Sequence, residues 1–438
     1  MNPSSLSIGD GWRYGLLGLP LAFAALPLYV HLPHHYASLG VPLTTLGGVL
    51  LLARAFDALT DPWLGRWLDG VFQAGPSAVM RRAWLIALML WLGLLGLLFP
   101  PAAAQGHLAA WALAGALVTT LAYSVLVIAH QSWGTRLGGD ATRQARIAAW
   151  REGCTLAGVV VASMLPALAG WTATLTVLAL VLLAALLALG RGPSPASLPL
   201  SSPSVTAHRS AKGADWRLPW QRSAFRRLMA VFVLNGLASA MPATLVLFFI
   251  ADRLQASEWQ GMFLAGYFGA AAAGMPAWLS AVRRIGLARA WLAAMGLSIA
   301  VFAWAALLGP GDAWAFAAVC VLSGLALGAD LALPAALLAG VIADAGDRGR
   351  HDGAYFGWWN LAAKGNLALA AGLGLPALAW LGYTPGTRDP TGLQALSLAY
   401  AILPCVIKAL AAWLLWRGWV RPPLSDVRPT SPGVAPPN

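Results

Sequence analysis

The sequence is poor in charge and in cysteine. Charged residues make up 10% of its 438 residues and hydrophobic residues 59%, whereas a typical soluble domain is about 25% charged. Its three cysteines, Cys154, Cys320 and Cys405, form no CxxC pair, which argues against a disulfide framework or a cysteine metal site. It also lacks a Ser/His/Asp set, an HExxH motif and a phosphate-binding loop. The sequence predicts a polytopic membrane protein that is not an enzyme.

Apolar stretches of about 20 residues, each long enough to cross a hydrocarbon core about 30 Å thick, recur along the chain. They predict an all-α protein with twelve transmembrane helices. The expected spans are 12–36, 44–68, 83–100, 107–133, 147–169, 171–190, 224–251, 259–280, 287–308, 313–343, 353–382 and 392–417.

The net charge of +12 does not indicate a nucleic-acid partner, because the basic residues lie in short segments between the apolar spans. With a cytoplasmic N-terminus, 22 of the 28 Lys and Arg residues fall on the cytoplasmic side, and the opposite loops hold only Arg253 and Arg388. This asymmetry predicts a multi-pass protein of the inner membrane with both termini in the cytoplasm. The expected partner of the apolar helix surfaces is the lipid bilayer.

The chain divides into two predicted six-helix halves, 1–190 and 223–420. Between them, 191–222 is a basic, Pro/Ser-rich cytoplasmic linker, and 421–438 is a Pro-rich tail predicted to be disordered in the cytoplasm. A weak repeat relates DPWLGRWLDG in the first half to GMPAWLSAVRRIGLARAWL in the second. Two such halves are typical of carriers that rock around a midplane site.

The stretch LLARAFDALTDPWLG places Asp57 and Asp61 four residues apart, on one face of a predicted membrane helix. Two carboxylates at this spacing must take up a proton, a cation or a basic partner. Thr60 and Ser124 could add oxygen ligands, which suit a hard cation. The pattern predicts a Na+ or H+ coupling site. The alternative is structural: Arg54 neutralises Asp57, and Asp61 caps the amides freed at Pro62.

Gly65 and Asp69 form a GxxxD motif that is followed by Arg81 and Arg82. This segment resembles the cytoplasmic loop signature of the major facilitator superfamily. The resemblance implies a structural or gating role for these residues, together with Arg54.

Four further stretches resemble one family of that superfamily, the glycoside-pentoside-hexuronide:cation symporters, which include melibiose permease. They are RAFDALTDPWLG, YSVLVIAHQSW, WREGCTLAG and GAYFGWWNLAAKGN. The resemblance implies the major facilitator fold and cation symport. It places Asp57, Asp61, Thr60 and Ser124 in the cation site, and Arg151 and Lys364 in the central cavity.

The family's galactoside-binding carboxylates correspond here to Ala22 and Val127, so the sugar-recognition groups of that family are missing. His130 is expected to be a hydrogen-bonded packing residue. For Lys364 the sequence leaves three partners open: Asp330, the paired aspartates, or an anionic substrate group. The residues expected to contact the substrate are Arg151, Lys364, Asn360, Asp330, Trp358, Trp359 and Tyr29.

The sequence therefore predicts a monomeric secondary transporter that couples the symport of a small polar solute, such as a sugar or sugar derivative, to Na+ or H+. No cofactor is expected, and no metal apart from Na+ as coupling ion. Two alternatives stay open: a lipid or lysolipid carrier of the same fold, and a polytopic membrane protein that does not transport.

Because Ala22 and Val127 cannot accept hydrogen bonds from a galactoside, we expect no measurable melibiose binding under conditions where the native substrate saturates. The measurement is competition by melibiose against that substrate. Competition at low millimolar concentration would contradict the prediction and would show that other residues recognise galactosides.

Overall fold

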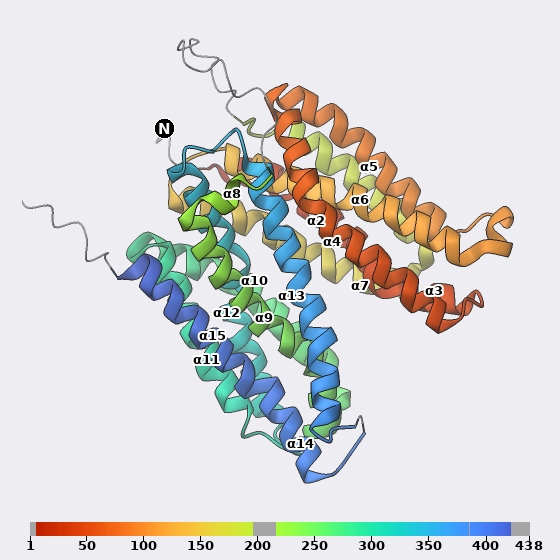
Figure 1. The fold of residues 1–438 in the computed structure, drawn as a ribbon, viewed down its shortest axis with the longest axis vertical. Helices are drawn as coiled ribbons and strands as arrows, with labels where there is room; N and C mark the ends of the chain where they lie inside the picture. Colours follow the sequence, from red (N-terminus) through yellow and green to blue (C-terminus); the bar gives the residue numbers. More distant parts are fainter. Residues whose placement is uncertain (1–5, 196–215, 385, 422–438) are drawn as a thin grey trace, which may run out of the picture.

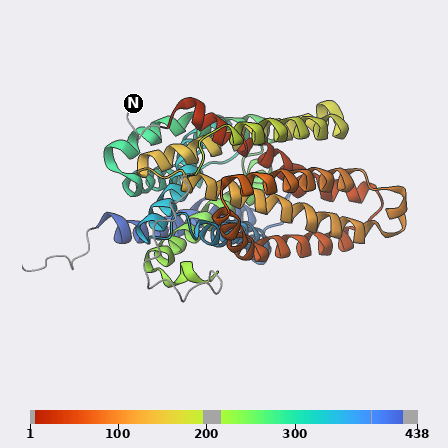
Figure 2. The same ribbon diagram turned by 90° about the horizontal axis from the view of Figure 1, so that it is seen from above.

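The computed structural model of the chain is helical, and it contains no strand within the residues that it describes, 6–195, 216–384 and 386–421. Two groups of helices make up the molecule (Figure 1). They come together at the end that carries α8 (Leu218–Gln221) and diverge toward α3 and α14. Figure 2 shows the same arrangement from above, with the N-terminal helices projecting to the right.

The first group begins with a broken segment: α1 (Ile8–Gly15), α2 (Gly18–Leu26), a π-helical turn (Pro27–His31) and α3 (Leu32–Ser38). Three prolines in this stretch, Pro20, Pro27 and Pro33, remove backbone donors and account for the breaks. The remaining helices of the group are α4 (Leu43–Gln73), α5 (Pro76–Leu98), a 3-10 turn (Ala102–His107), α6 (Leu108–Arg136) and α7 (Ala141–Gly190).

α7 contains the fifth and sixth predicted spans. It is kinked at Gly170, whose φ of 75° and ψ of 174° are not helical. The kink lies where the sequence predicts the break between 169 and 171. Glycine tolerates this positive φ without a steric penalty.

The second group follows α8. Its helices are α9 (Ser223–Phe248), a π-helical turn (Phe249–Arg253), a 3-10 turn (Ser257–Trp259), α10 (Gln260–Ile285), α11 (Leu287–Ala305), α12 (Ala313–Asp344), α13 (Asp352–Trp380), α14 (Pro390–Ser397), a π-helical turn (Leu398–Ile402), α15 (Leu403–Leu415) and a last π-helical turn (Trp416–Val420).

Eight helices within the described residues are long and apolar enough to cross a membrane. α4, which carries Arg54, Asp57, Asp61, Arg66 and Asp69, is not among them. The all-α polytopic fold is thus confirmed, while the count of twelve crossings remains a prediction. Most of the predicted linker and tail, 196–215 and 422–438, lies outside the described residues.

The apolar core has a large cluster made only of residues between Leu6 and Leu189 in the first group. A second cluster joins the groups: Leu68, Val125 and Ile128 pack with residues of α9 to α13. A third, around Phe249, Phe316 and Tyr400, lies within the second group. The two groups therefore have cores of their own and also share an apolar contact.

α4 and α13 cross at backbone contact, and glycines make this possible. A Cβ added to Gly65 would lie 1.9 Å from the carbonyl oxygen of Gly353, and one added to Gly357 would lie 2.4 Å from that of Asp61. Small residues permit such close helix packing inside a membrane. The crossing fixes which α13 side chains face the aspartates of α4.

We expect Gly65→Ala to destabilise the protein by about 1 to 3 kcal/mol, because the new methyl group overlaps the backbone of α13. The control is Gly70→Ala on the same helix, where a Cβ meets nothing within 4 Å; this change should be neutral or slightly stabilising. Thermal unfolding of the purified variants measures both effects. Equal unfolding midpoints would contradict the prediction.

Candidate transport site

Lys364 lies between the paired aspartates and contacts both. Its Nζ is 2.8 Å from Oδ1 of Asp57 and 2.8 Å from Oδ2 of Asp61. It also donates to Oγ of Ser124 at 2.8 Å, and Ser124 donates to Oδ1 of Asp57 at 2.6 Å. Three helices, α4, α6 and α13, thus bring their polar side chains to one point, which we call the Lys364 cluster (Asp57, Asp61, Ser124 and Lys364).

The charges of the Lys364 cluster do not balance. Two carboxylates face one ammonium group, and the Asp57 and Asp61 side chains are 3% and 0% exposed. Oδ1 of Asp61 has no hydrogen-bond partner among the described residues. Buried carboxylates are costly unless they are paired, so the cluster can accept one more positive charge.

Other residues predicted for the cation site play smaller parts. The Thr60 hydroxyl donates to the backbone carbonyl of Asp57 at 3.2 Å, and the structure gives it no contact with either carboxylate. Arg54 lies on an exposed part of α4. Lys364 contacts both aspartates, so Arg54 is not the sole counter-charge of Asp57.

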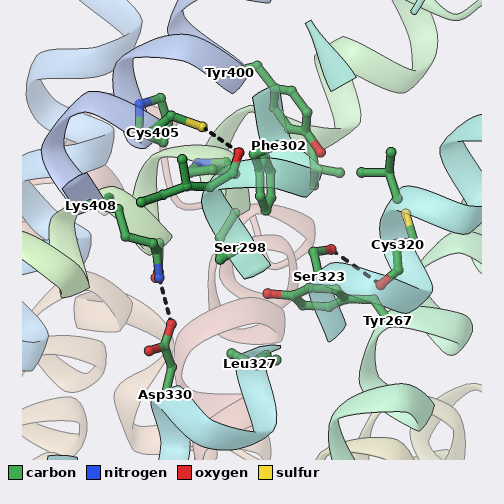
Figure 3. Close-up of a pocket in the computed structure, with 18 of the residues that line it drawn as sticks. Tyr267, Ser298, Phe302, Cys320, Ser323, Leu327, Asp330, Tyr400, Cys405 and Lys408 are labelled. Carbon is green, nitrogen blue, oxygen red and sulfur yellow. Dashed lines mark hydrogen bonds and ion pairs between the residues drawn. The ribbon is translucent and has the colours of Figure 1, made fainter. Parts of the chain in front are cut away.

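A second buried ion pair joins Lys408 of α15 to Asp330 of α12, with 2.6 Å between Nζ and Oδ2 (Figure 3). Lys408 also donates to Oδ1 of Asn235 at 2.9 Å, and Nε1 of Trp291 donates to Oδ1 of Asp330 at 2.8 Å. Asp330 is therefore not the partner of Lys364, one of the options that the sequence left open. The sequence analysis assigned no role to Lys408, which lies inside the predicted span 392–417.

The other predicted substrate residues are bonded in pairs. Arg151 donates to Oε1 of its neighbour Glu152 from Nε at 2.9 Å and from Nη2 at 2.8 Å. Asn360 of α13 and Gln131 of α6 exchange amide hydrogen bonds of 2.8 and 3.3 Å. The Asn360 pair links the two helix groups one turn from Lys364.

His130 is a packing residue, as predicted. Its Nε2 lies 2.8 Å from the carbonyl oxygen of Tyr14, and the Tyr14 hydroxyl donates to the carbonyl of His130 at 3.0 Å. The two rings are 4.5 Å apart. This reciprocal contact ties α1 to α6.

The tryptophans expected to stack on substrate have other partners. Trp358 stacks on Trp216 at 5.3 Å and donates to its carbonyl at 2.8 Å. Trp359 stacks on Phe232 at 3.5 Å. Their roles are therefore in packing, and we leave both out of the candidate site. The side chain of Tyr29 lies outside the described part of the structure.

Asp69 is the acidic member of a network near the linker end of the molecule. It accepts from the backbone N–H groups of Gly353 and Ala354 at 2.8 and 2.9 Å and from Nη2 of Arg136 at 2.8 Å. Nε of Arg136 lies 3.1 Å from Oδ2 of Asp352. The network joins α4 and α6 to the start of α13, so it holds the two helix groups together.

Arg81 and Arg82, for which the sequence implied a structural or gating role, lie at exposed positions on α5. Arg82 donates to the carbonyl of Ala78 at 3.4 Å. The cation that pairs with Asp69 is Arg136, which the sequence did not single out. In the sequence, Arg136 lies just after one predicted span and Asp352 just before another. Opposite charges at these two helix ends could have indicated the network.

One histidine lies near this network, in the turn between α12 and α13. Burial lowers the pKa of His351, and the charge of Asp347 opposes that shift. The side chain is therefore neutral near pH 7. It adds no charge beside the Arg136 guanidinium.

Comparison with known proteins agrees with this architecture. A family model described as MFS/sugar transport protein matches residues 13–419. The fold is similar to that of a bacterial homologue of iron transporter ferroportin in an outward-facing state, with a TM-score of 0.65 and 17% identity over 93% of this chain and 100% of that one. It is also similar to the E.coli fucose:proton symporter FucP, with a TM-score of 0.57 and 15% identity over 91% and 98%. No curated protein sequence matches.

The family match identifies a polytopic membrane transporter, not an enzyme. The chain belongs to the MFS/sugar transport protein family. The predicted major facilitator fold and multi-pass membrane embedding are thereby confirmed. A small-molecule substrate follows from the family.

We expect Lys364→Ala to cost about 3 to 5 kcal/mol of stability, because it leaves two facing carboxylates without their cation. Substrate affinity should fall as well. Lys364→Arg retains the charge without the compact ammonium geometry and should be affected less. Thermal unfolding and substrate binding measure the two effects, with cation binding assayed separately.

The control for this prediction is Arg284→Ala, which removes a positive charge at an exposed position of α10. It should leave both stability and affinity unchanged. Full substrate affinity in Lys364→Ala would assign the lysine a structural role and would move the binding site toward Arg151.

Proposed function

We propose that the protein is a secondary active transporter that couples the symport of a small polar solute, with sugars and sugar derivatives as the leading class, to Na+ or H+. The observation that carries this proposal is the charge imbalance of the Lys364 cluster. One added cation or proton would neutralise two buried carboxylates that share a single ammonium group. Carboxylate and hydroxyl oxygens are suitable ligands for a hard cation.

The same geometry gives the coupling ion a way to act on the solute. Lys364 belongs to α13 and the aspartates belong to α4, so their contact spans the two helix groups. A cation bound to Asp57 and Asp61 would weaken their electrostatic attraction for Lys364. The ammonium group could then donate a hydrogen bond to a solute. Substrate binding would then depend on cation binding, which is the requirement for symport.

Alternating access would use the Asp69–Arg136–Asp352 network. The two groups meet there and diverge toward α3 and α14 (Figure 1). With the linker end in the cytoplasm, as the distribution of Lys and Arg suggests, this arrangement would be an outward-open form. Breaking the network would permit the inward-open form.

The proposal includes the organisation that the sequence suggests: halves 1–190 and 223–420, a cytoplasmic linker 191–222, and a cytoplasmic tail 421–438. It further includes insertion as a monomer in the inner membrane with both termini in the cytoplasm, and no cofactor. A carrier of lipids or lysolipids is the alternative, and the assay below also distinguishes it.

We expect Asp57→Asn and Asp61→Asn to abolish solute accumulation driven by a Na+ or H+ gradient in proteoliposomes, because each removes a charge that the coupling ion neutralises. Folding should be largely retained, since Lys364 keeps one carboxylate in each variant. The control is Asp10→Asn, at the surface in α1. Full accumulation by either variant would contradict the coupling assignment; movement of labelled lysolipid instead of polar solutes would favour the alternative.

A further inference from the structure

The linker between the halves ends in an aromatic segment. Residues 191–215 contain no Phe, Trp or Tyr, whereas WRLPWQR, which follows directly, contains Trp216 and Trp220. A polar Pro/Ser-rich connection has no need of large apolar side chains. Trp216 precedes α8 and Trp220 lies within it, at the end where the two helix groups meet (Figure 1). The two tryptophans therefore call for a role beyond connecting the halves.

The aromatic segment is attached to the second helix group. Nε1 of Trp358 on α13 donates to the carbonyl oxygen of Trp216 at 2.8 Å, and the two rings stack with 5.3 Å between centroids. Trp220 packs edge-on against Trp358 at 5.2 Å and against Phe225 of α9 at 5.5 Å. Nη1 of Arg226 on α9 donates to the carbonyl oxygen of Trp220 at 2.7 Å. Trp216 would therefore move together with α9 and α13.

The ring of Trp216 also contacts the first helix group. It lies 5.5 Å from the ring of Trp63 on α4, with 38° between the ring planes. Trp63 follows Pro62, and Trp358 follows Gly357, where an added Cβ would lie 2.7 Å from Cα of Pro62. The contact thus lies beside the glycine crossing of α4 and α13, and Trp216 bridges the two helices there.

Separation of α4 from α13 would break this bridge. Trp216 would stay with α13, and Trp63, which is 51% exposed even in the presence of Trp216, would lose its aromatic partner. One aromatic pair is sufficient to change the population ratio of two forms about twofold to tenfold. A contact present in one form only favours that form, so Trp216 favours the form in which α4 and α13 touch.

We propose that Trp216 is a positioning residue of the transport cycle, through which the linker stabilises the form that is closed at the linker end. The inference rests on the alternating access of the proposed function. Trp216 acts from the outer surface of α4, while the Asp69–Arg136–Asp352 network acts between the helix groups. The linker thereby contributes to the balance between the two forms of the carrier.

The experiment measures opening of the linker end in the purified protein, without solute or ion gradient. Thr135→Cys places a thiol in a small cavity that both helix groups line, with Gln131 from the first and Phe356 from the second. Thr135 is 3% exposed, so a water-soluble maleimide reaches this thiol when the groups separate. The rate of modification, followed by peptide mass spectrometry, therefore reports the population of the open form.

We expect Trp216→Ala and Trp63→Ala each to raise the modification rate at position 135 about twofold to tenfold over Thr135→Cys alone. The variant with both exchanges should match the larger single effect, because both remove the same contact. Trp216→Phe keeps an aromatic ring and should remain closer to the wild type.

The matched control is Trp67→Ala, the same exchange one turn further along α4. Trp67 is 46% exposed and makes no ring contact with another described residue, so the rate should not change. The native Cys320, in the third apolar cluster, reports unfolding and should react no faster in any variant. Unchanged rates at position 135 in both Trp216→Ala and Trp63→Ala, an equal rise in Trp67→Ala, or a parallel rise at Cys320 would each overturn the inference.

This proposal and cation coupling can fail separately. Faster modification in Trp216→Ala and Trp63→Ala, with no solute uptake under any gradient, would support the role of Trp216 and overturn symport. Gradient-driven uptake by the wild type, with unchanged modification rates in both variants, would overturn the role of Trp216 and leave symport intact.

Discussion

The contact between α4 and α13 is the constraint on which the rest of the molecule depends. At Gly65, Gly353 and Gly357 the two helix backbones touch, so their relative position is fixed to a fraction of a side-chain length. Toward the linker end this places the start of α13 against Asp69. Further along it places Lys364 between Asp57 and Asp61. One crossing point thus sets both the Asp69–Arg136–Asp352 network and the Lys364 cluster.

The two buried lysines differ in what their partners allow. Lys408 and its hydrogen-bond partners all lie in the second helix group, so relative motion of the groups leaves that pair intact. Lys364 bonds to residues of the first group, and its contacts would break if α4 and α13 separated. Buried ion pairs add little net stability on average. Lys408 therefore joins residues of one helix group, while Lys364 joins the two groups.

The sequence predicted the helical fold and the position of the Asp57/Asp61 pair because both depend on local periodicity. Residues four apart share a helix face whatever surrounds them. It also named the paired aspartates among the partners of Lys364, since a buried ammonium needs a carboxylate. It could not choose among the candidates, because that choice depends on the glycine crossing of two helices about 300 residues apart.

The predicted contacts were wrong for side chains that could make equivalent contacts with more than one partner. Trp358 and Trp359 were expected to face a substrate, but an indole ring packs equally well on Trp216 or Phe232. Arg81 and Arg82 follow Asp69 on the next helix of the sequence, while the cation that contacts Asp69 is Arg136, from another helix. Sequence proximity says little about ion pairs between helices.

The unequal charge of the Lys364 cluster has an electrical consequence. The empty cluster carries one excess negative charge, and a single bound cation makes it neutral. The loaded carrier would then cross between its two forms without moving net charge through the field, while the empty carrier would return with a negative charge. An inside-negative potential of 100 mV acts on each unit charge with about 2.3 kcal/mol. Voltage would thus accelerate the return of the empty transporter and not the delivery of its cargo.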